Sequence, residues 1–290
     1  MSLATDSCGA PKGWAGHLDL HYAHDVRYGT RLRHRHDGPM RVFKSLYPHG
    51  PDCCHTVLIH PPGGLVGGDS LSLRLALEAG AHALLSTPGA TRFYASDQAR
   101  ALQRVHIDMA AGSRLEWCPL EAIAYPSCKA INQWQAQLAP GAELMAWDVL
   151  ALGLPAAGLA FDCGHYQQEV SITGHWLERL RIDAGDAELM SGPLGLAGRR
   201  AMASFWFASG DPLPSARQQQ LVEAARALLP PPTPQGRVQL AVTSPNRHVV
   251  VVRGLADQVE PLMQALQSVW AVWRAEAWGM SSPPPRIWQV

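Results

Sequence analysis

The stretch Leu77-Glu-Ala-Gly-Ala-His-Ala-Leu84 decides the fold of this chain, because three later stretches repeat its pattern. Each copy places a glycine between two apolar segments, and glycine turns the chain through positive φ angles that other residues avoid. The pattern predicts a repeating unit of a strand, a glycine turn and a return strand. The later copies are Met109-Ala-Ala-Gly-Ser-Arg-Leu-Glu116, Leu138-Ala-Pro-Gly-Ala-Glu-Leu-Met145 and Ile182-Asp-Ala-Gly-Asp-Ala-Glu-Leu189.

The segments around these turns alternate apolar and polar residues with the period of two that is typical of strands. One face of a predicted strand carries Leu71, Leu73, Leu75 and Leu77, and one face of another carries Val105, Ile107 and Met109. We expect a mainly β fold of stacked β-hairpins or coils in a two-layer, β-helix-like arrangement. A β-helix-like stack and a two-layer sandwich both bury such faces, so the sequence leaves this choice open.

Two helices are predicted in the C-terminal third, over about 215–229 and 257–277. The first carries an apolar stripe and ends before Pro230, because proline cannot continue a helix. The second begins near Asp257, with Glu260 as its capping partner. Its apolar stripe is expected to pack in the core, since such faces usually do.

Composition excludes several classes of function. Lys plus Arg equals Asp plus Glu at 24 each, so no net field attracts nucleic acid or an anionic membrane. The chain begins with no signal-peptide pattern, and its longest apolar stretch is interrupted by Pro155. The six cysteines lack paired spacing, which favours reduced thiols. We expect a cytoplasmic protein, and the ten tryptophans favour a protein complex.

The densest local chemistry lies in the ten residues from His60 to Asp69, read His-Pro-Pro-Gly-Gly-Leu-Val-Gly-Gly-Asp. Their spacing approaches that of a P-loop, but Asp69 stands where the phosphate-binding lysine would be, and a carboxylate repels phosphate. A rigid turn between two strands is the competing interpretation. The residues that fix its backbone path are Pro61, Pro62, Gly63, Gly64, Gly67 and Gly68.

Other candidate sites are weaker. Five histidines within the first 36 residues lack a companion ligand at metal-site spacing. A second group of possible metal ligands consists of Cys53-Cys54-His55 together with His60. Neighbouring cysteines of a strand face opposite sides, so at most one of them would join His60 easily. The favoured interpretation is a buried strand cysteine that acts as a small apolar residue. A cytosolic β-fold hydrolase that uses Asp69 and Glu121 stays open as an alternative. The chain contains neither a GxSxG nor an HExxH motif, so we assign no catalytic residue.

The loop from His60 to Asp69, followed by Thr87-Pro-Gly-Ala-Thr-Arg-Phe-Tyr94, resembles the UreD (UreH) family of urease accessory proteins. The resemblance extends from about Thr30 to the last residues, and Arg92 departs from it where lysine is usual. It implies a variable segment over 1–29 and a single β domain over 30–290. Three further stretches resemble the family: Trp117-Cys-Pro-Leu-Glu121, Gly195-Leu-Ala-Gly-Arg199 and Pro285-Arg-Ile-Trp288.

The resemblance implies a non-catalytic scaffold or chaperone for assembly of the urease metallocentre. Such a protein would bind apo-urease and UreF directly, meet the GTPase UreG through that complex, and assist GTP-dependent nickel insertion. No tightly bound cofactor is expected, only transient Ni²⁺. Nickel in transit needs ligands that exchange readily, and on this basis we expect Asp69 on its route, with Glu178 and His60 as companions. Because tryptophan and arginine are enriched at interface hot spots, the expected partner-binding residues are Arg286, Ile287 and Trp288; packing of this tail in the core is the alternative.

Overall fold

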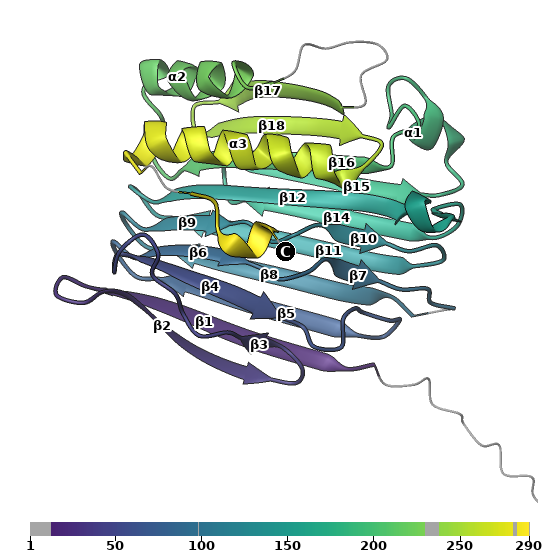
Figure 1. Cartoon of the computed structure of the whole chain (residues 1–290), viewed down its shortest axis with the longest axis horizontal. Helices are drawn as coiled ribbons and strands as arrows, with labels where there is room; N and C mark the ends of the chain where they lie inside the picture. Colours follow the sequence, from purple (N-terminus) through teal and green to yellow (C-terminus); the bar gives the residue numbers. More distant parts are fainter. Residues whose placement is uncertain (1–12, 98, 230–237, 281–282, 290) are drawn as a thin grey trace, which may run out of the picture.

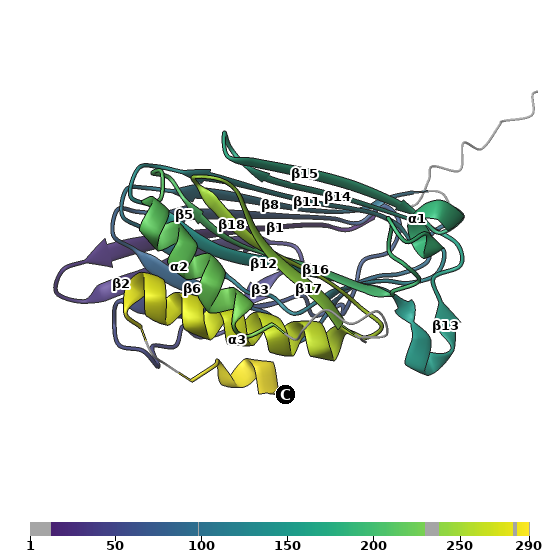
Figure 2. The ribbon, with the colours of Figure 1, turned by 90° about the horizontal axis from the view of Figure 1, so that it is seen from above.

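The computed structural model describes residues 13–97, 99–229, 238–280 and 283–289. It consists of two stacked β-sheets with a layer of helices on the outer face of the second sheet (Figures 1 and 2). The first sheet contains, in spatial order, β15 (Trp176–Asp183), β14 (His165–Ile172), β11 (Lys129–Leu138), β8 (Ala101–Met109), β5 (Ser70–Leu77), β1 (Ala15–Asp25) and β2 (Gly29–Asp37).

The second sheet has a main path of eight strands and three short additions. In spatial order the path is β17 (Val238–Asn246), β18 (Val249–Ala256), β16 (Ala201–Ser209), β12 (Glu143–Leu154), β9 (Arg114–Trp117), β6 (His82–Ser86), β4 (Cys53–Ile59) and β3 (Arg41–Val42). The additions are β7 (Thr91–Phe93), β10 (Ala122–Ala124) and β13 (Leu159–Ala160). The helices are α1 (Ala187–Ser191), α2 (Ser215–Arg226) and α3 (Val259–Trp278), with 3-10 turns at Pro155–Ala157 and Arg286–Gln289.

The glycine turns of the repeat join the two sheets. β5 lies in the first sheet and β6, which follows Gly80, lies in the second; β8 and β9, and β11 and β12, are related in the same way. Gly80, Gly112 and Gly141 have φ angles of 73°, 67° and 78°. The amide of Gly80 donates to the carbonyl of Ala111 at 3.1 Å, so neighbouring turns are bonded to one another. The repeat therefore forms stacked coils, which confirms the mainly β, β-helix-like prediction.

Parallel pairing keeps these coils in register. Leu77 lies opposite Met109, and Met109 lies opposite Leu138, so equivalent positions of three repeats are aligned. The fourth copy differs, because Gly185 follows β15 and leads into α1, and its φ is not positive. The regular coil therefore ends after three copies, where β14 and β15 form an antiparallel hairpin instead.

Two apolar cores lie on opposite faces of the second sheet. The core between the sheets contains Cys54, Leu73 and Trp134, and the core beneath α2 and α3 contains Cys53, Trp147 and Trp273. The neighbours Cys53 and Cys54 thus face opposite sides of β4, as the sequence predicted. The predicted core position of the last helix is also confirmed, since Leu266, Trp270 and Trp273 are fully buried.

Several boundaries differ from the prediction. β1 pairs with β5 and β2, so part of the segment 1–29 belongs to the sheet; residues 1–12 lie outside the described part. The final helix begins at Val259 after Gln258, without a side-chain cap, because Asp257 pairs with Arg199 at 2.8 Å. α2 ends at Arg226, and α1 was not predicted. Pro230 is outside the described residues.

No helix in the described ranges is long and apolar enough to cross a membrane.

The repeat makes a testable prediction about its glycines. We expect Gly112→Ala to lower the free energy of unfolding by about 1–2 kcal/mol, because alanine is strained at positive φ. Gly185→Ala is the matched control, since this glycine occupies the same place in the fourth copy without positive φ; it should have little effect or be slightly stabilising. Urea unfolding of both variants measures the difference. Equal destabilisation would contradict this account of the turns.

Candidate functional site

Three of the sequence motifs meet at one end of the second sheet. β4, β6 and β9 are neighbouring parallel strands, and their carboxyl ends therefore lie together. The loop from His60 to Asp69 follows β4, the segment from Thr87 to Tyr94 follows β6, and the segment from Cys118 to Glu121 follows β9. The in-register stacking of the coils thus brings together residues that are far apart in the sequence.

The loop from His60 to Asp69 is paired with the motif that follows β6. The amide of Leu65 donates to the carbonyl of Arg92 at 2.7 Å, and the amide of Tyr94 donates to the carbonyl of Leu65 at 2.9 Å. A Cβ on Gly64 would collide with the ring of Tyr94, and one on Gly67 would collide with Ser96. Gly63 and Gly68 have φ angles of 79° and 94°, whereas Pro61 and Pro62 are exposed at the turn.

Asp69 holds this loop in place. Its Oδ1 accepts a hydrogen bond from the amide of Trp14 at 2.8 Å, and its Oδ2 accepts one from the amide of Val66 at 3.0 Å. The carboxylate therefore ties the loop to the start of the first strand of the chain. This role accounts for an acid at the end of the glycine-rich path.

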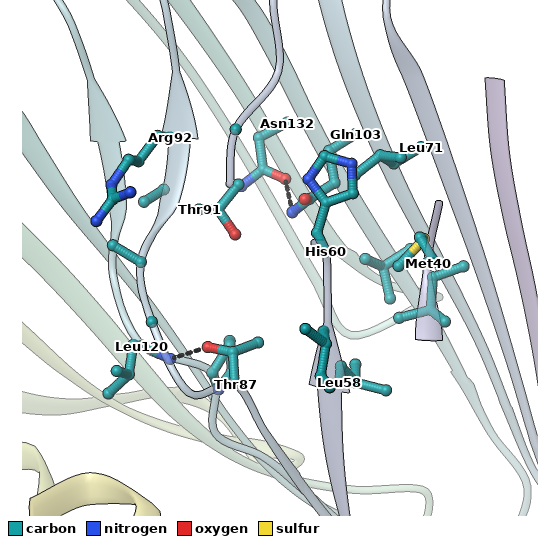
Figure 3. Close-up of a pocket in the computed structure, with 18 of the residues that line it drawn as sticks. Met40, Leu58, His60, Leu71, Thr87, Thr91, Arg92, Gln103, Leu120 and Asn132 are labelled. Atoms are coloured by element: carbon teal, nitrogen blue, oxygen red, sulfur yellow. Dashed lines mark hydrogen bonds between the residues drawn. The ribbon is translucent and has the colours of Figure 1, made fainter. Parts of the chain in front are cut away.

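A pocket of about 200 Å³ lies between the two sheets, where these loops meet (Figure 3). His60, Thr91 and Arg92 line it from the loops, and Leu71, Leu73 and Trp134 line it from the first sheet. The polar side chains at its interior are linked: Gln103 Nε2 donates to Asn132 Oδ1 at 3.3 Å, and Asn132 Nδ2 donates to Asp148 Oδ2 at 3.1 Å. Among the described lining residues, Asp148 is the only acid.

The pocket changes the ionisation of its acid and its imidazole. Burial raises the pKa of Asp148 to about 6, because removal from water disfavours the carboxylate, while hydrogen bonds from Gln168 and Asn132 oppose this shift. Burial lowers the pKa of His60, and the nearby charge of Asp69 opposes that change. At neutral pH the pocket therefore presents a neutral imidazole and a largely ionised carboxylate.

The structure brings His60 and Asp69 near one another but places Glu178 elsewhere. Glu178 lies on β15, at the opposite end of the first sheet from β1, and its Oε2 pairs with Arg253 of β18 at 2.7 Å. The charge of Glu178 contributes to the raised pKa of Asp148, which lies on β12 of the second sheet. Asp148 is the acid of the pocket, and it was not singled out in the sequence analysis. A single acid in the apolar run Met145-Ala-Trp-Asp-Val-Leu150 was the available signal.

The two acids of the hydrolase alternative have different surroundings. Burial raises the pKa of Glu121; the charge of Glu260 adds to this shift and the charge of Arg92 opposes it. Asp69 instead binds the amides of Trp14 and Val66. Neither acid lines the pocket between the sheets. No observation favours a paired role for them in hydrolysis.

The C-terminal 3-10 turn lies against the body of the protein. Trp288 Nε1 donates to Ser86 Oγ at 2.8 Å, and the Trp288 ring lies 5.0 Å from the ring centroids of Trp147 and Trp270. Ile287 is partly buried and Arg286 is exposed. Of the three expected partner-binding residues, Trp288 is thus an anchor to the chain itself, and Arg286 presents a cation to the surface.

The raised pKa of Asp148 predicts how stability depends on pH. A carboxyl with a higher pKa in the folded state stabilises the fold below its unfolded pKa, and this contribution is lost as pH rises through about 6. Asp148→Asn should remove this loss, so the variant gains up to about 3 kcal/mol over the parent between pH 4 and pH 7. Urea unfolding across this range measures it, with Asp52→Asn at an exposed position as control. Parallel pH profiles of parent and Asp148→Asn would contradict the prediction.

Comparison with known proteins identifies the family. A sequence model described as "UreD urease accessory protein" matches residues 15–289. The chain is 50% identical over 282 residues to the urease accessory protein UreD of Leptothrix cholodnii, and 52% identical over 277 residues to that of Albidiferax ferrireducens. It is 49% identical over 278 residues to the UreD of a Polaromonas species. Each match covers 96% of this chain and 99% of the relative.

These matches span nearly the whole chain, including the three loops around the pocket and the C-terminal turn. The resemblance seen in the sequence is confirmed, and with it a role in urease maturation. The chain belongs to the UreD family of urease accessory proteins.

Proposed function

We propose that this chain is a cytoplasmic, non-catalytic scaffold that binds apo-urease and UreF, meets UreG through that complex, and assists GTP-dependent nickel insertion. The observation that carries the proposal is the pocket between the sheets, where three loops shared with the family surround a buried carboxylate. In this proposal Ni²⁺ is a cargo that passes through the chain. No resident cofactor is required.

The chemistry of the pocket suits a cation that must leave again. Asp148 supplies a carboxylate, His60 an imidazole, and Asn132 and Gln103 amide oxygens. Oxygen ligands bind divalent cations with ready exchange, whereas several thiolates would hold nickel tightly. The pKa of Asp148 near 6 also means that its carboxylate is poorly stabilised by the protein alone, so an arriving cation gains from pairing with it.

The other expected nickel ligands take positions around Asp148 in this proposal. His60 and Asp69 form the outer end, where Asp69 retains lone pairs beyond its two backbone hydrogen bonds. Glu178 forms the far end, near Asp148, but its pairing with Arg253 must open before it can bind a cation. The route thus runs between the sheets from the loop after β4 toward β15.

The C-terminal turn is the proposed docking element for UreF. Trp288 fixes the turn on the body, and the exposed side chain of Arg286 is left for a partner beside the partly buried Ile287. Arginine is enriched at interface hot spots, where its guanidinium forms several hydrogen bonds at once. An anchored turn also loses little conformational freedom on binding, which favours affinity.

Replacement of Asp148 tests the nickel route. We expect Asp148→Asn to reduce nickel loading of apo-urease at least about tenfold, because the pocket loses its only charged oxygen ligand among the described residues. The measurement is the nickel content of urease after incubation with the accessory complex and GTP. Asp108→Asn, at an exposed position on β8, is the control and should load normally.

Pull-down of UreF and apo-urease separates a blocked route from a failed scaffold. Asp148→Asn should retain both partners, and full nickel loading by this variant would contradict the route.

A chain that ends at Gly279 should lose UreF; retention would contradict docking at the C-terminal turn. Asp69→Ala is expected to lower loading as well, and a normal level would remove Asp69 from the route.

A further inference from the structure

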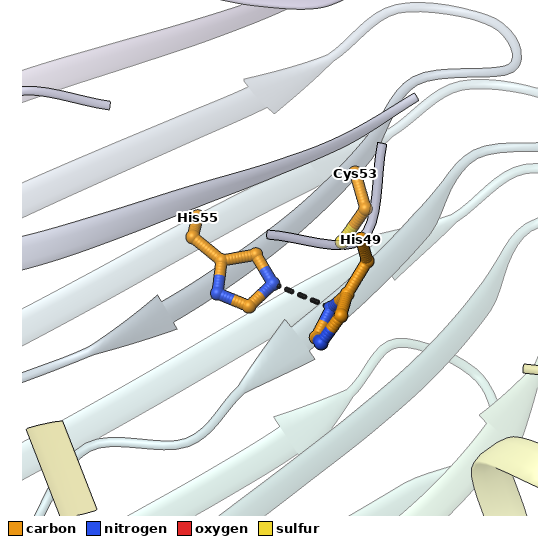
Figure 4. Close-up of side chains that lie close together, drawn as sticks. All are labelled: His49, Cys53 and His55. Atoms are coloured by element: carbon orange, nitrogen blue, oxygen red, sulfur yellow. Dashed lines mark hydrogen bonds between the residues drawn. The ribbon is translucent and has the colours of Figure 1, made fainter. Parts of the chain in front are cut away.

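A second group of metal-ligating side chains lies on the other face of the second sheet. His49, in the loop before β4, lies close to Cys53 and His55 on β4, and each residue offers one ligand atom (Figure 4). One ligand atom of each residue lies within 4.8 Å of those of the other two, and His49 Nδ1 lies 2.9 Å from His55 Nε2. Cys53 and His55 are buried beneath α3, whereas His49 is partly exposed and provides access from solvent.

The hydrogen bonds of His49 fix the tautomer of its ring, so that Nδ1 is unprotonated, as a metal ligand must be. Arg274 Nη2 can only donate, and it lies 3.1 Å from His49 Nδ1, so this nitrogen accepts and carries no proton. His49 interacts through its other ring nitrogen with the backbone of Pro283, since its Nδ1 already has its partners. Ligating histidines typically hold their second N–H on a backbone carbonyl, which sets ring orientation and tautomer.

His55 completes the pair of imidazoles. Its Nε2 lies 2.9 Å from His49 Nδ1 and donates to it, because His49 Nδ1 is an acceptor. Tetrahedral ligation at about 2.1 Å would hold two nitrogens roughly 3.4 Å apart. The two rings therefore need to separate by only a few tenths of an ångström. The proton on His55 Nε2 moves to Nδ1 of the same ring, which keeps the imidazole neutral.

We propose that His49, Cys53 and His55 form a binding site for a borderline divalent transition-metal ion of the zinc, cobalt and nickel class. One thiolate and two imidazoles are ligands that this class prefers. On binding, the Sγ–H bond of Cys53 breaks, an Sγ–metal bond forms, and the proton leaves to solvent. This site is separate from the pocket between the sheets, because Cys53 and Cys54 face opposite sides of β4.

Of the neighbouring buried charges, Arg274 contacts this set of ligands at His49 Nδ1 and Cys53 Sγ, whereas Glu116 belongs to the alternative set. A metal ion on His49 Nδ1 would take the place of the hydrogen bond from Arg274. Glu116 lies with Cys53 and His82 in a second possible group, but its Oε1 already accepts from His82 at 2.7 Å and from Arg274 at 3.2 Å. Its other oxygen accepts from Trp270. Arg274 Nη2 lies 3.6 Å from Cys53 Sγ, where it would donate to the thiolate of the metal complex.

Cobalt(II) titration of the full chain tests the site. The parent for this experiment carries Cys163→Ser and Cys8→Ser, which removes the exposed thiol and the one outside the described residues. We expect one Co²⁺ per chain, with a thiolate-to-cobalt charge-transfer band in the near ultraviolet. Cys53→Ser should abolish the band, whereas Cys54→Ser, on the same strand but the opposite face, should retain it.

Further variants keep the proposal falsifiable if Cys53→Ser folds poorly. His49→Gln, at a partly exposed position, should bind Co²⁺ at least about tenfold more weakly with an unchanged melting temperature. Asp148→Asn should leave the band unchanged, which separates this site from the proposed nickel route. Absence of the band in the parent, its persistence in Cys53→Ser, or unchanged affinity in His49→Gln would overturn the proposal.

Discussion

The in-register stacking of parallel coils is the constraint on which the rest of this structure depends. Turns at Gly80, Gly112 and Gly141 carry the chain from one sheet to the other, and their backbones bond to one another. Equivalent strands of neighbouring coils therefore begin and end side by side. This alignment makes β4, β6 and β9 end together, so that the loops that follow them surround one pocket between the sheets.

Two deeply placed acids, Glu116 and Asp148, lie on opposite faces of the second sheet and differ in their hydrogen-bond partners. Burial opposes the ionisation of Glu116, but His82, Arg274 and Trp270 bond to it and hold its pKa below the usual range. This network joins α3 to β9 and β6. Asp148 has only amide partners, so burial dominates and raises its pKa. An acid without a cationic partner is the one available to a passing cation.

Much of the fold followed from the sequence, because turn glycines and alternating apolar residues are local signals. These signals predicted the coils, and the apolar stripe of α3 predicted its burial. The choice between a sandwich and a stack required the pairing of β5 with β8, which is not local. For the same reason the sequence predicted the start of α3 near Asp257, which instead forms an ion pair with Arg199. It also assigned no strand to the residues of β1, which pair with β5.

The candidate site was predicted in part. The loop from His60 to Asp69 is indeed at the pocket, but the structure assigns both Asp69 oxygens to backbone amides, which its sequence position did not reveal. Asp148 was missed because only the third dimension places it beside Asn132 and opposite the loop. His49 likewise joins Cys53 and His55 across a turn, whereas His60, which was grouped with them in the sequence analysis, follows the far end of β4.

The central claim is that nickel passes between the sheets beside Asp148. Anomalous scattering at the nickel absorption edge, from crystals of the chain in complex with its partners and Ni²⁺, tests this most directly. The account predicts an anomalous peak inside the pocket, within bonding distance of the Asp148 carboxylate. Nickel peaks confined to the outer surface of the protein, with an empty pocket at saturating Ni²⁺, would contradict it.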